Sequence, residues 1–171
     1  MEHYSVLLNE AIENLNIKED GIYVDATLGL GGHSSKILEK LTTGHLYAFD
    51  EDKMAIDYAD KRLAKINSNY TIIKSNFVNL KAKLEELGVT AIDGIVFDLG
   101  VSSPQIDTAS RGFSFSKDGL LDMRMDTDSH LTAEQVVNEY KKEELTNIFF
   151  NYGEEKQSRL IASKIVAKRP I

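Results

Sequence analysis

The chain has 171 residues, of which 42% are hydrophobic, and a formal net charge of -7. This length suits one domain, or one domain with part of another, and allows roughly 70% of the unfolded surface to be buried. The acidic balance argues against a protein that binds nucleic acid by bulk electrostatics, so any such contact should be local. The absence of cysteine excludes disulfides and thiolate metal sites, and it is compatible with a reducing compartment.

The chain carries no recognisable targeting or membrane segment. Residues 1–8 lack a basic stretch followed by an apolar one, and no apolar run approaches the length of a membrane span. We therefore expect a cytoplasmic protein that has no membrane partner. Basic residues gather near the carboxyl end, where a solvated helix face is the simpler interpretation. They are Lys156, Arg159, Lys164, Lys168 and Arg169.

Apolar spacing predicts strands that alternate with helices along the first part of the chain. A first helix should start at Val6 with Ser5 as its cap. Strands are expected over 22–27, 46–49, 70–73 and 92–99, and helices over 34–41, 54–66 and 80–87. Such alternation is typical of an α/β fold with a parallel, doubly wound sheet and right-handed crossovers.

The alternation stops after Gln105. Residues 106–130 have the composition of a loop, and 132–169 should form two or three helices, with Thr132 and Gln135 at capping-box spacing and Pro170 beyond the last. A sheet limited to the four predicted strands would be small for this class. We therefore expect the chain to be a fragment of a longer protein.

A glycine-rich segment, D-A-T-L-G-L-G-G-H at 25–33, joins the first strand to its helix. Glycines there let the backbone approach a ligand, and Asp50 at the end of the second strand can accept both hydroxyls of a ribose. Ser34 stands where a dinucleotide fingerprint has its third glycine, which disfavours NAD. Asp25 at the strand end, ahead of the glycines, better suits a methyltransferase loop. For Asp25 the alternative is a cap on the following turn, and for His33 it is a structural hydrogen-bond donor.

The third predicted strand is followed by S-N-F at 75–77, where Phe77 can stack on an adenine or pack in the core. Polar or aromatic residues therefore follow every predicted strand. In open α/β sheets ligands bind outside the carboxyl ends of the strands. The series predicts a binding site along that edge.

The fourth strand leads into the most informative segment, D-G-I-V-F-D-L-G-V-S-S-P-Q at 93–105. Its apolar run is typical of a strand buried on both faces, and it ends on Asp98. Pro104 disfavours a helical Ser103, so the loop should be stiff and extended, with the Gln105 amide available to a polar ligand. An ordinary Ser/Pro turn is the alternative.

These motifs, together with R-G-F-S-F-S-K-D-G-L-L-D-M-R-M-D from Arg111 to Asp126, resemble the small-subunit ribosomal RNA cytosine-N4 methyltransferases, the MraW or RsmH family. N-E at 9–10 and Y-G-E-E at 152–155 match the same family in order and spacing. The resemblance implies a Rossmann-like class I S-adenosylmethionine-dependent core over 1–105. It also implies a lid loop and helical substrate-recognition insert, partial here, over 106–171. Family members are much longer, so this piece is expected to lack strands and, without them, to bind the cofactor weakly or to lack activity.

The resemblance implies S-adenosylmethionine as cofactor, with seven binding residues. They are Gly31, Gly32, His33, Asp50, Phe77, Asp98 and Gln105. The catalytic residues would be Asp98, Ser103, Pro104 and Gln105. The turn formed by Ser103, Pro104 and Gln105 resembles the Ser-Pro-Pro-aromatic loop of enzymes that methylate cytosine amines in DNA. In that loop, oxygen atoms accept the hydrogens of the amine.

The Arg111 segment is expected to contact RNA, with Arg111 and Arg124 on phosphates and Phe113 and Phe115 stacked on bases. The alternative is an ordered lid packed on its own aromatics. No metal is expected, because the aspartates of 118–128 lack the glycine and terminal glutamate of a calcium loop.

The implied reaction methylates the exocyclic N4 amine of a cytosine in 16S ribosomal RNA, with the base unstacked into the pocket. Proximity and electrostatic preorganisation would provide most of the acceleration. The partner would be 16S rRNA or the small ribosomal subunit, with a homodimer as one candidate assembly. Two alternatives stay open: an NAD(P)-dependent oxidoreductase, and a non-catalytic cofactor-binding module of ribosome assembly.

Overall fold

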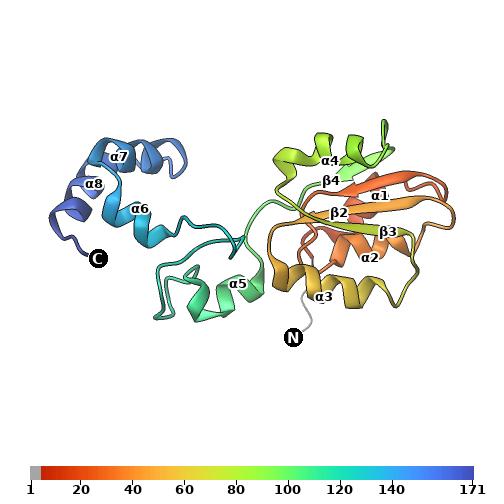
Figure 1. Cartoon of the computed structure of the whole chain (residues 1–171), viewed down its shortest axis with the longest axis horizontal. Helices are drawn as coiled ribbons and strands as arrows, with labels where there is room; N and C mark the ends of the chain where they lie inside the picture. The colour runs from red at the N-terminus through yellow and green to blue at the C-terminus, as the bar shows by residue number, and fades with distance from the viewer. Residues whose placement is uncertain (1–4) are drawn as a thin grey trace. The chain divides into compact units, whose positions relative to one another are not determined.

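The computed structural model describes residues 5–171. Contacts divide the chain into two compact units, residues 1–102 and 103–171, which are described separately below (Figure 1). This division falls slightly before the boundary at residue 105 expected from sequence. The expectation that residues 1–8 carry no targeting segment falls partly on residues 1–4, which lie outside the described residues.

The first unit is built on a parallel sheet with the strand order β3-β2-β1-β4. The strands are β1 Ile22–Asp25, β2 His45–Asp50, β3 Tyr70–Lys74 and β4 Gly94–Val96. The chain runs outward from β1 to β3 and then returns to place β4 on the other side of β1. The order therefore reverses between β1 and β4, the position at which open α/β sheets bind their ligands.

Helices cover both faces of the sheet, as the predicted doubly wound α/β architecture requires. Three lie on one face: α1 Leu8–Asn14, α2 Gly32–Leu38 and α3 Lys53–Leu63. The 3-10 turn η1 Phe77–Asn79 leads into α4 Leu80–Glu86, which packs on the other face. The predicted fold class is thereby confirmed, with element ends shifted by a few residues.

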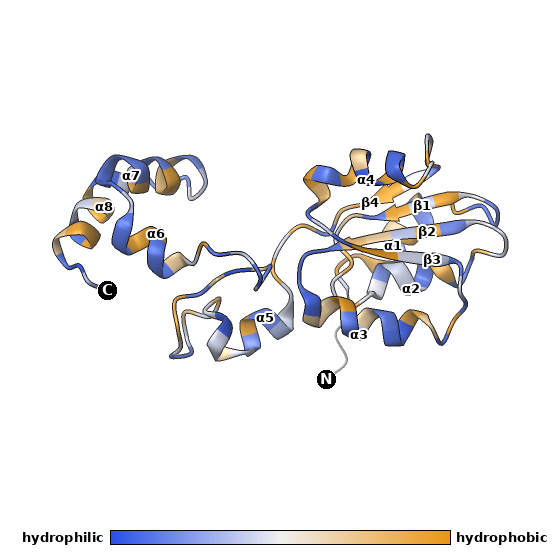
Figure 2. Ribbon diagram, in the orientation of Figure 1, coloured by the Kyte–Doolittle hydropathy of each residue, from blue (hydrophilic) through white to orange (hydrophobic). Residues whose placement is uncertain are grey.

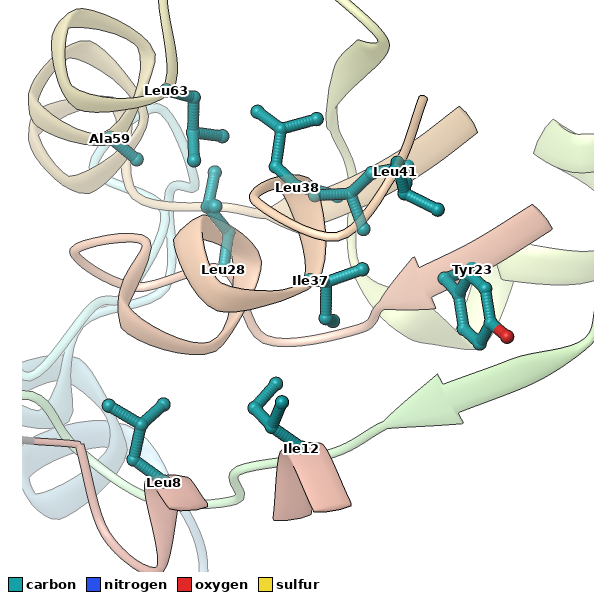
Figure 3. Packing of buried hydrophobic residues seen from close by; sticks show 11 residues of the cluster. Leu8, Ile12, Tyr23, Leu28, Ile37, Leu38, Leu41, Ala59 and Leu63 are labelled. Atoms are coloured by element: carbon teal, nitrogen blue, oxygen red, sulfur yellow. The ribbon is translucent and has the colours of Figure 1, made fainter. Parts of the chain in front are cut away.

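The core follows the period-two alternation of strand side chains. Tyr23, Leu46 and Ala48 point to the face covered by α1, α2 and α3, where Figure 3 shows the leucines and isoleucines of those helices in contact. Val24 and Phe49 point to the α4 face. Complete burial of a leucine contributes about 1.5–3 kcal/mol, so the first face, with the larger set of buried residues, supplies most of the stabilisation of this unit.

Two local predictions were wrong. The first helix begins at Leu8, not Val6, and its N-cap is Leu7 with φ 49°, without a side-chain cap. Ser5 is buried instead against the start of α2, where a Cβ on Gly32 would collide with the Ser5 hydroxyl. The fourth strand is also shorter than expected, and Phe97 beyond it is 48% exposed. The residues of β4 are only partly buried, so its run is not fully buried on both faces.

The second unit contains α5 Ser103–Asp107, the 3-10 turn η2 Ala109–Arg111, α6 Ala133–Glu139, α7 Lys142–Asn151 and α8 Ser158–Ala167. Three helices follow residue 132, as predicted, and Figure 2 shows hydrophobic and hydrophilic residues on each. The predicted capping box is confirmed: the Gln135 amide donates to Thr132 Oγ1 at 3.2 Å, and the Thr132 amide donates to Gln135 Oε1 at 3.0 Å.

The basic residues at the carboxyl end divide into two groups. Arg169 donates from Nε to the Val137 carbonyl at 2.7 Å and from Nη2 to the Tyr140 carbonyl, and so it satisfies carbonyls at the end of α6. The other four basic side chains of this run are exposed, as the simpler interpretation expected. Across residues 5–171, none of the helices is long and apolar enough to cross a membrane.

Candidate functional site

The candidate site lies at the carboxyl edge of the sheet in the first unit. All four strands are parallel, so their carboxyl ends meet at one edge. Asp25 ends β1 and Asp50 ends β2, while Phe77 and Asp98 follow β3 and β4. The structure thus brings together the polar and aromatic residues that the sequence placed after successive strands.

Asp25 holds the glycine loop from within the protein. It is 1% exposed, and its Oδ1 accepts the Thr27 amide at 3.1 Å while Oδ2 accepts the Ser34 hydroxyl at 2.6 Å. Burial raises the pKa of the Asp25 carboxyl, and the hydrogen bonds from Ser34 and Thr27 oppose that shift. The cap interpretation of Asp25 is therefore correct, and Ser34 is its second partner.

The loop after Asp25 reaches both neighbouring strands. The Ala26 amide donates to the Val96 carbonyl of β4 at 2.9 Å, and the Leu28 amide donates to the Phe49 carbonyl of β2 at 2.8 Å. Gly29 and Gly31 then adopt φ of 51° and 75°, which suit glycine. At Gly31 a Cβ would also lie 3.2 Å from the Ala59 Cβ, so glycine permits close packing of α2 against α3.

Asp50 ties this loop to the second strand. Its Oδ2 accepts the Gly29 amide at 2.7 Å, and its Oδ1 accepts the Asp52 amide at 2.9 Å. Burial is the largest cause of the raised pKa of Asp50, and the backbone hydrogen bonds oppose it. A carboxylate has about four acceptor positions, so Asp50 retains capacity for a further hydrogen bond, such as one from a ribose hydroxyl.

Phe77 and Phe97, which follow β3 and β4, form an aromatic pair at the same edge of the sheet. Phe77 is 41% exposed and belongs to neither core cluster, so the core-packing alternative is wrong for this residue. Its ring meets Phe97 edge to face, with centroids 5.7 Å apart. Asn76 caps η1 through the Val78 amide at 2.8 Å and donates from Nδ2 to Glu51 Oε2 at 3.0 Å. The exposed area of Phe77 can therefore be covered by a planar ligand.

His33 and Asp98 complete the edge. His33 is 5% exposed at the start of α2, and its Nδ1 lies 3.8 Å from Asp98 Oδ2, too far for a hydrogen bond. The Asp98 side chain is 42% exposed, whereas its backbone amide donates to Thr27 Oγ1 at 2.6 Å. Asp98 therefore presents a carboxylate to solvent from a fixed backbone.

The Ser103–Gln105 segment departs from expectation. It forms the beginning of α5 in the second unit, so the predicted extended loop is wrong. Pro104 lies in the first turn, where its missing amide costs no helical hydrogen bond, and its carbonyl accepts the Thr108 amide at 3.0 Å. Gln105 is 6% exposed and thus buried within the chain.

The two arginines expected at RNA hold their own loop. Arg124 donates from Nε and Nη2 to the Asp122 carboxylate at 2.9 and 2.6 Å, and from Nη1 to the Thr127 and Ser129 carbonyls. Arg124 also lowers the pKa of Asp122, chiefly through its side-chain hydrogen bonds. Arg111 donates from Nη2 to the Arg124 carbonyl at 2.8 Å. Both guanidinium groups therefore organise the segment that carries them.

The aromatics of the same segment differ from each other. The Arg111 guanidinium carbon lies 5.9 Å from the Phe113 ring centroid, a cation–π arrangement, and Phe113 is half-buried. Phe115 is fully exposed. Of the four side chains expected at RNA, Phe115 is thus the one most accessible to a base. Between residues 5 and 171, no group of three or more histidines, aspartates or glutamates could hold a metal ion.

Sequence reasoning missed two side chains at this edge, Thr27 and Phe97. Both stand beside residues that it had selected, but the contacts that matter cross the sheet: Thr27 reaches Asp98, and Phe97 reaches Phe77. The only available signal was their position next to strand ends.

Comparison with known proteins identifies the family of the chain. Residues 1–171 match the family described as "MraW methylase family". The chain belongs to this family. Ribosomal RNA small subunit methyltransferase H of Mycoplasma mycoides subsp. mycoides SC is 58% identical over 171 residues, which cover 99% of this chain and 56% of that protein. The corresponding protein of Exiguobacterium sibiricum is 58% identical over 170 residues, covering 99% and 54%.

The chain thus spans about half the length of the curated relatives it matches. A solved structure of a candidate rRNA methylase from Clostridium thermocellum matches with a TM-score of 0.50 at 23% identity, covering 59% of this chain and 54% of that one. This match supports the fold. Membership in a methylase family removes the support for the oxidoreductase alternative. That alternative already lacked the third glycine of the dinucleotide-binding pattern, because Ser34 occupies its position.

Proposed function

We propose that the first unit binds S-adenosylmethionine at the carboxyl edge of its sheet, and that the protein methylates the N4 amine of a cytosine in small-subunit ribosomal RNA in the cytoplasm. The observation that carries the cofactor assignment is Asp50. It is fixed by two backbone amides and keeps acceptor capacity beside a glycine loop at the switch point of the sheet. The names of the full-length relatives support the substrate.

The proposed roles of Asp50, Phe77 and Asp98 follow from what each residue leaves accessible, whereas those of Gly31, Gly32 and His33, which are buried, rest on the family resemblance. Asp50 accepts the ribose hydroxyls, and Phe77 stacks on the adenine while the Phe97 edge restrains its ring. The backbone at Gly31 and Gly32 and the His33 ring line the amino-acid portion. The exposed Asp98 carboxylate attracts the positive charge of the cofactor. Gln105 is proposed as a further cofactor contact on the strength of the family resemblance.

When bound, S-adenosylmethionine supplies an electrophilic methyl group attached to a sulfonium. On the family resemblance alone, Ser103, Pro104 and Gln105 are proposed to hold the target amine so that its nitrogen lone pair faces that methyl. The amine is a poor nucleophile because its lone pair is delocalised into the ring, so acceptors that hold its hydrogens favour attack. The nitrogen then releases a proton to solvent, and no strong base is required.

The second unit is proposed to recognise the RNA. Phe115 stacks on an unpaired base, while Phe113, Arg111 and Arg124 shape the segment that presents it. In this proposal any phosphate contact by the two arginines is secondary, because both guanidiniums already donate to carbonyls or a carboxylate within the segment. The substrate is 16S rRNA, free or within the small subunit.

The test uses the full-length gene product with S-adenosylmethionine labelled in its methyl group, together with naked 16S rRNA and with small subunits from cells lacking the enzyme. Label should appear on N4 of a single cytosine. Asp50→Ala should abolish labelling, while Asp57→Ala on the exposed face of α3 should not. Cofactor binding without label in either RNA would favour the non-catalytic assembly module instead.

A further inference from the structure

We propose that Thr27 is a positioning residue that couples the glycine loop to Asp98, so that the two sides of the cofactor site are set together. This inference rests on the proposed function. It begins from a side-chain hydrogen bond that joins the carboxyl ends of β1 and β4: the Asp98 amide donates to Thr27 Oγ1 at 2.6 Å. These residues lie at the reversal point of the sheet.

Hydrogen bonds from three backbone amides hold Thr27 and its two neighbours in place. Its own amide donates to Asp25 Oδ1 at 3.1 Å. The amides on either side, those of Ala26 and Leu28, donate to the carbonyl ends of β4 and β2 at 2.9 and 2.8 Å. With both flanking amides engaged, the Thr27 backbone cannot follow a shift of Asp98, and its hydroxyl is a fixed acceptor.

The hydrogen bonds continue into α2. Asp25 Oδ2 accepts the Ser34 hydroxyl at 2.6 Å, and Asp25 and Ser34 are 1% and 0% exposed. Ser34 is the residue that interrupts the dinucleotide fingerprint, and its buried hydroxyl gives a serine at this position a structural role. The path runs from the Asp98 amide through Thr27 and Asp25 to Ser34, which is adjacent in sequence to His33.

This series of hydrogen bonds explains how the Asp98 side chain can be exposed to solvent while its backbone is held in place. Its side chain makes no hydrogen bond with His33, since the nearest atoms are 3.8 Å apart. β4 is a short edge strand that ends two residues earlier, at Val96. The hydrogen bond to Thr27 therefore fixes the backbone beyond the last strand pair and sets the direction of the Asp98 carboxylate.

The test replaces Thr27 by Val, which keeps the shape and removes the acceptor, and by Ser, which keeps the acceptor. Thr71→Val is the matched control, because the Thr71 hydroxyl also makes one side-chain hydrogen bond, 2.9 Å to His45 Nε2, on β3 of the same sheet. Calorimetry of the full-length gene product with S-adenosylhomocysteine reports affinity. Hydrogen exchange at the Asp98 amide reports the local bond, and urea unfolding reports overall stability.

We expect Thr27→Val to weaken binding about tenfold, since the Asp98 amide loses its acceptor and the carboxylate its direction, and to speed exchange at Asp98. Thr27→Ser should stay within about twofold of wild type, and Thr71→Val should lower stability comparably without changing affinity. Wild-type affinity in Thr27→Val, or an equal loss in Thr71→Val, would overturn the inference while leaving the proposed function intact. If wild type itself does not bind, the proposed function fails first and the coupling with it.

Discussion

The glycine loop at 25–34 and the segment at 111–126 use charged side chains in opposite ways. Asp25 in the glycine loop and Asp50 at the end of β2 both accept amides of that loop, and both carboxyls have raised pKa values because they are buried. In the later segment, Arg124 donates to the Asp122 carboxylate and to backbone carbonyls near the surface. In both regions, charged side chains therefore form hydrogen bonds that hold the local backbone in place.

The difference lies in what remains for a ligand. A carboxylate that accepts one amide on each oxygen keeps about half of its acceptor capacity. Arg124 has five N–H donors in all, and the four hydrogen bonds to Asp122, Thr127 and Ser129 use most of them. We therefore expect the first region to bind its ligand through Asp50, and the second region to bind through the exposed Phe115.

The largest expected effect concerns Asp50. Asp50→Asn should weaken S-adenosylhomocysteine binding on the order of 10- to 100-fold, because charge-assisted hydrogen bonds to the ribose are lost. Asp57→Asn removes an acid from exposed α3, where its partner is Lys53, and should leave affinity unchanged. Calorimetry on both variants measures the contrast. Equal affinities would mean that Asp50 serves the loop alone.

The next effect separates Phe115 from Arg124. Phe115→Ala should weaken binding of a single-stranded rRNA oligonucleotide about five- to tenfold through lost stacking, with no change in the order of the segment. Arg124→Lys cannot reproduce the bidentate contact with Asp122 and should speed hydrogen exchange over 122–130. Fluorescence anisotropy and exchange measure the two. If Arg124→Lys weakened RNA binding without faster hydrogen exchange over 122–130, Arg124 would contact the RNA itself, and the contrast with Phe115 would be wrong.

The smallest effect is a pH dependence set by Asp25. Its pKa is raised in the folded state, so its stabilising contribution is present below the unfolded value of 3.8 and is lost as pH rises through the folded value. Asp25→Asn lacks this dependence. Urea unfolding should therefore show the wild type losing stability relative to Asp25→Asn as pH increases from about 4. A relative gain by the wild type over that range would contradict the assigned direction.

The sequence predicted the elements whose signals are local. Apolar runs indicated all four strands, and the spacing of Thr132 and Gln135 indicated a capping box that the structure contains. The glycines, Asp50 and Asp98 were selected by position after strands, and they do meet at one edge.

The failures have tertiary causes. Phe97 lies just beyond the short strand β4 and is 48% exposed, although its apolar run predicted burial. The residue before a proline usually avoids helix, yet Ser103 is helical. Thr27 and Asp98 are separated by 71 positions, so their hydrogen bond cannot be read from spacing. Which charges hold the backbone and which remain for a ligand depends on such distant pairs.

The central claim is that the acids at the carboxyl edge of the sheet bind S-adenosylmethionine. Calorimetric titration of the full-length gene product with S-adenosylhomocysteine, with NADH as the competing ligand, tests it most directly. Saturable one-site binding of S-adenosylhomocysteine, lost in Asp50→Ala and absent for NADH, is the predicted result. No binding of S-adenosylhomocysteine by the folded protein, or binding that Asp50→Ala leaves unchanged, would contradict the claim.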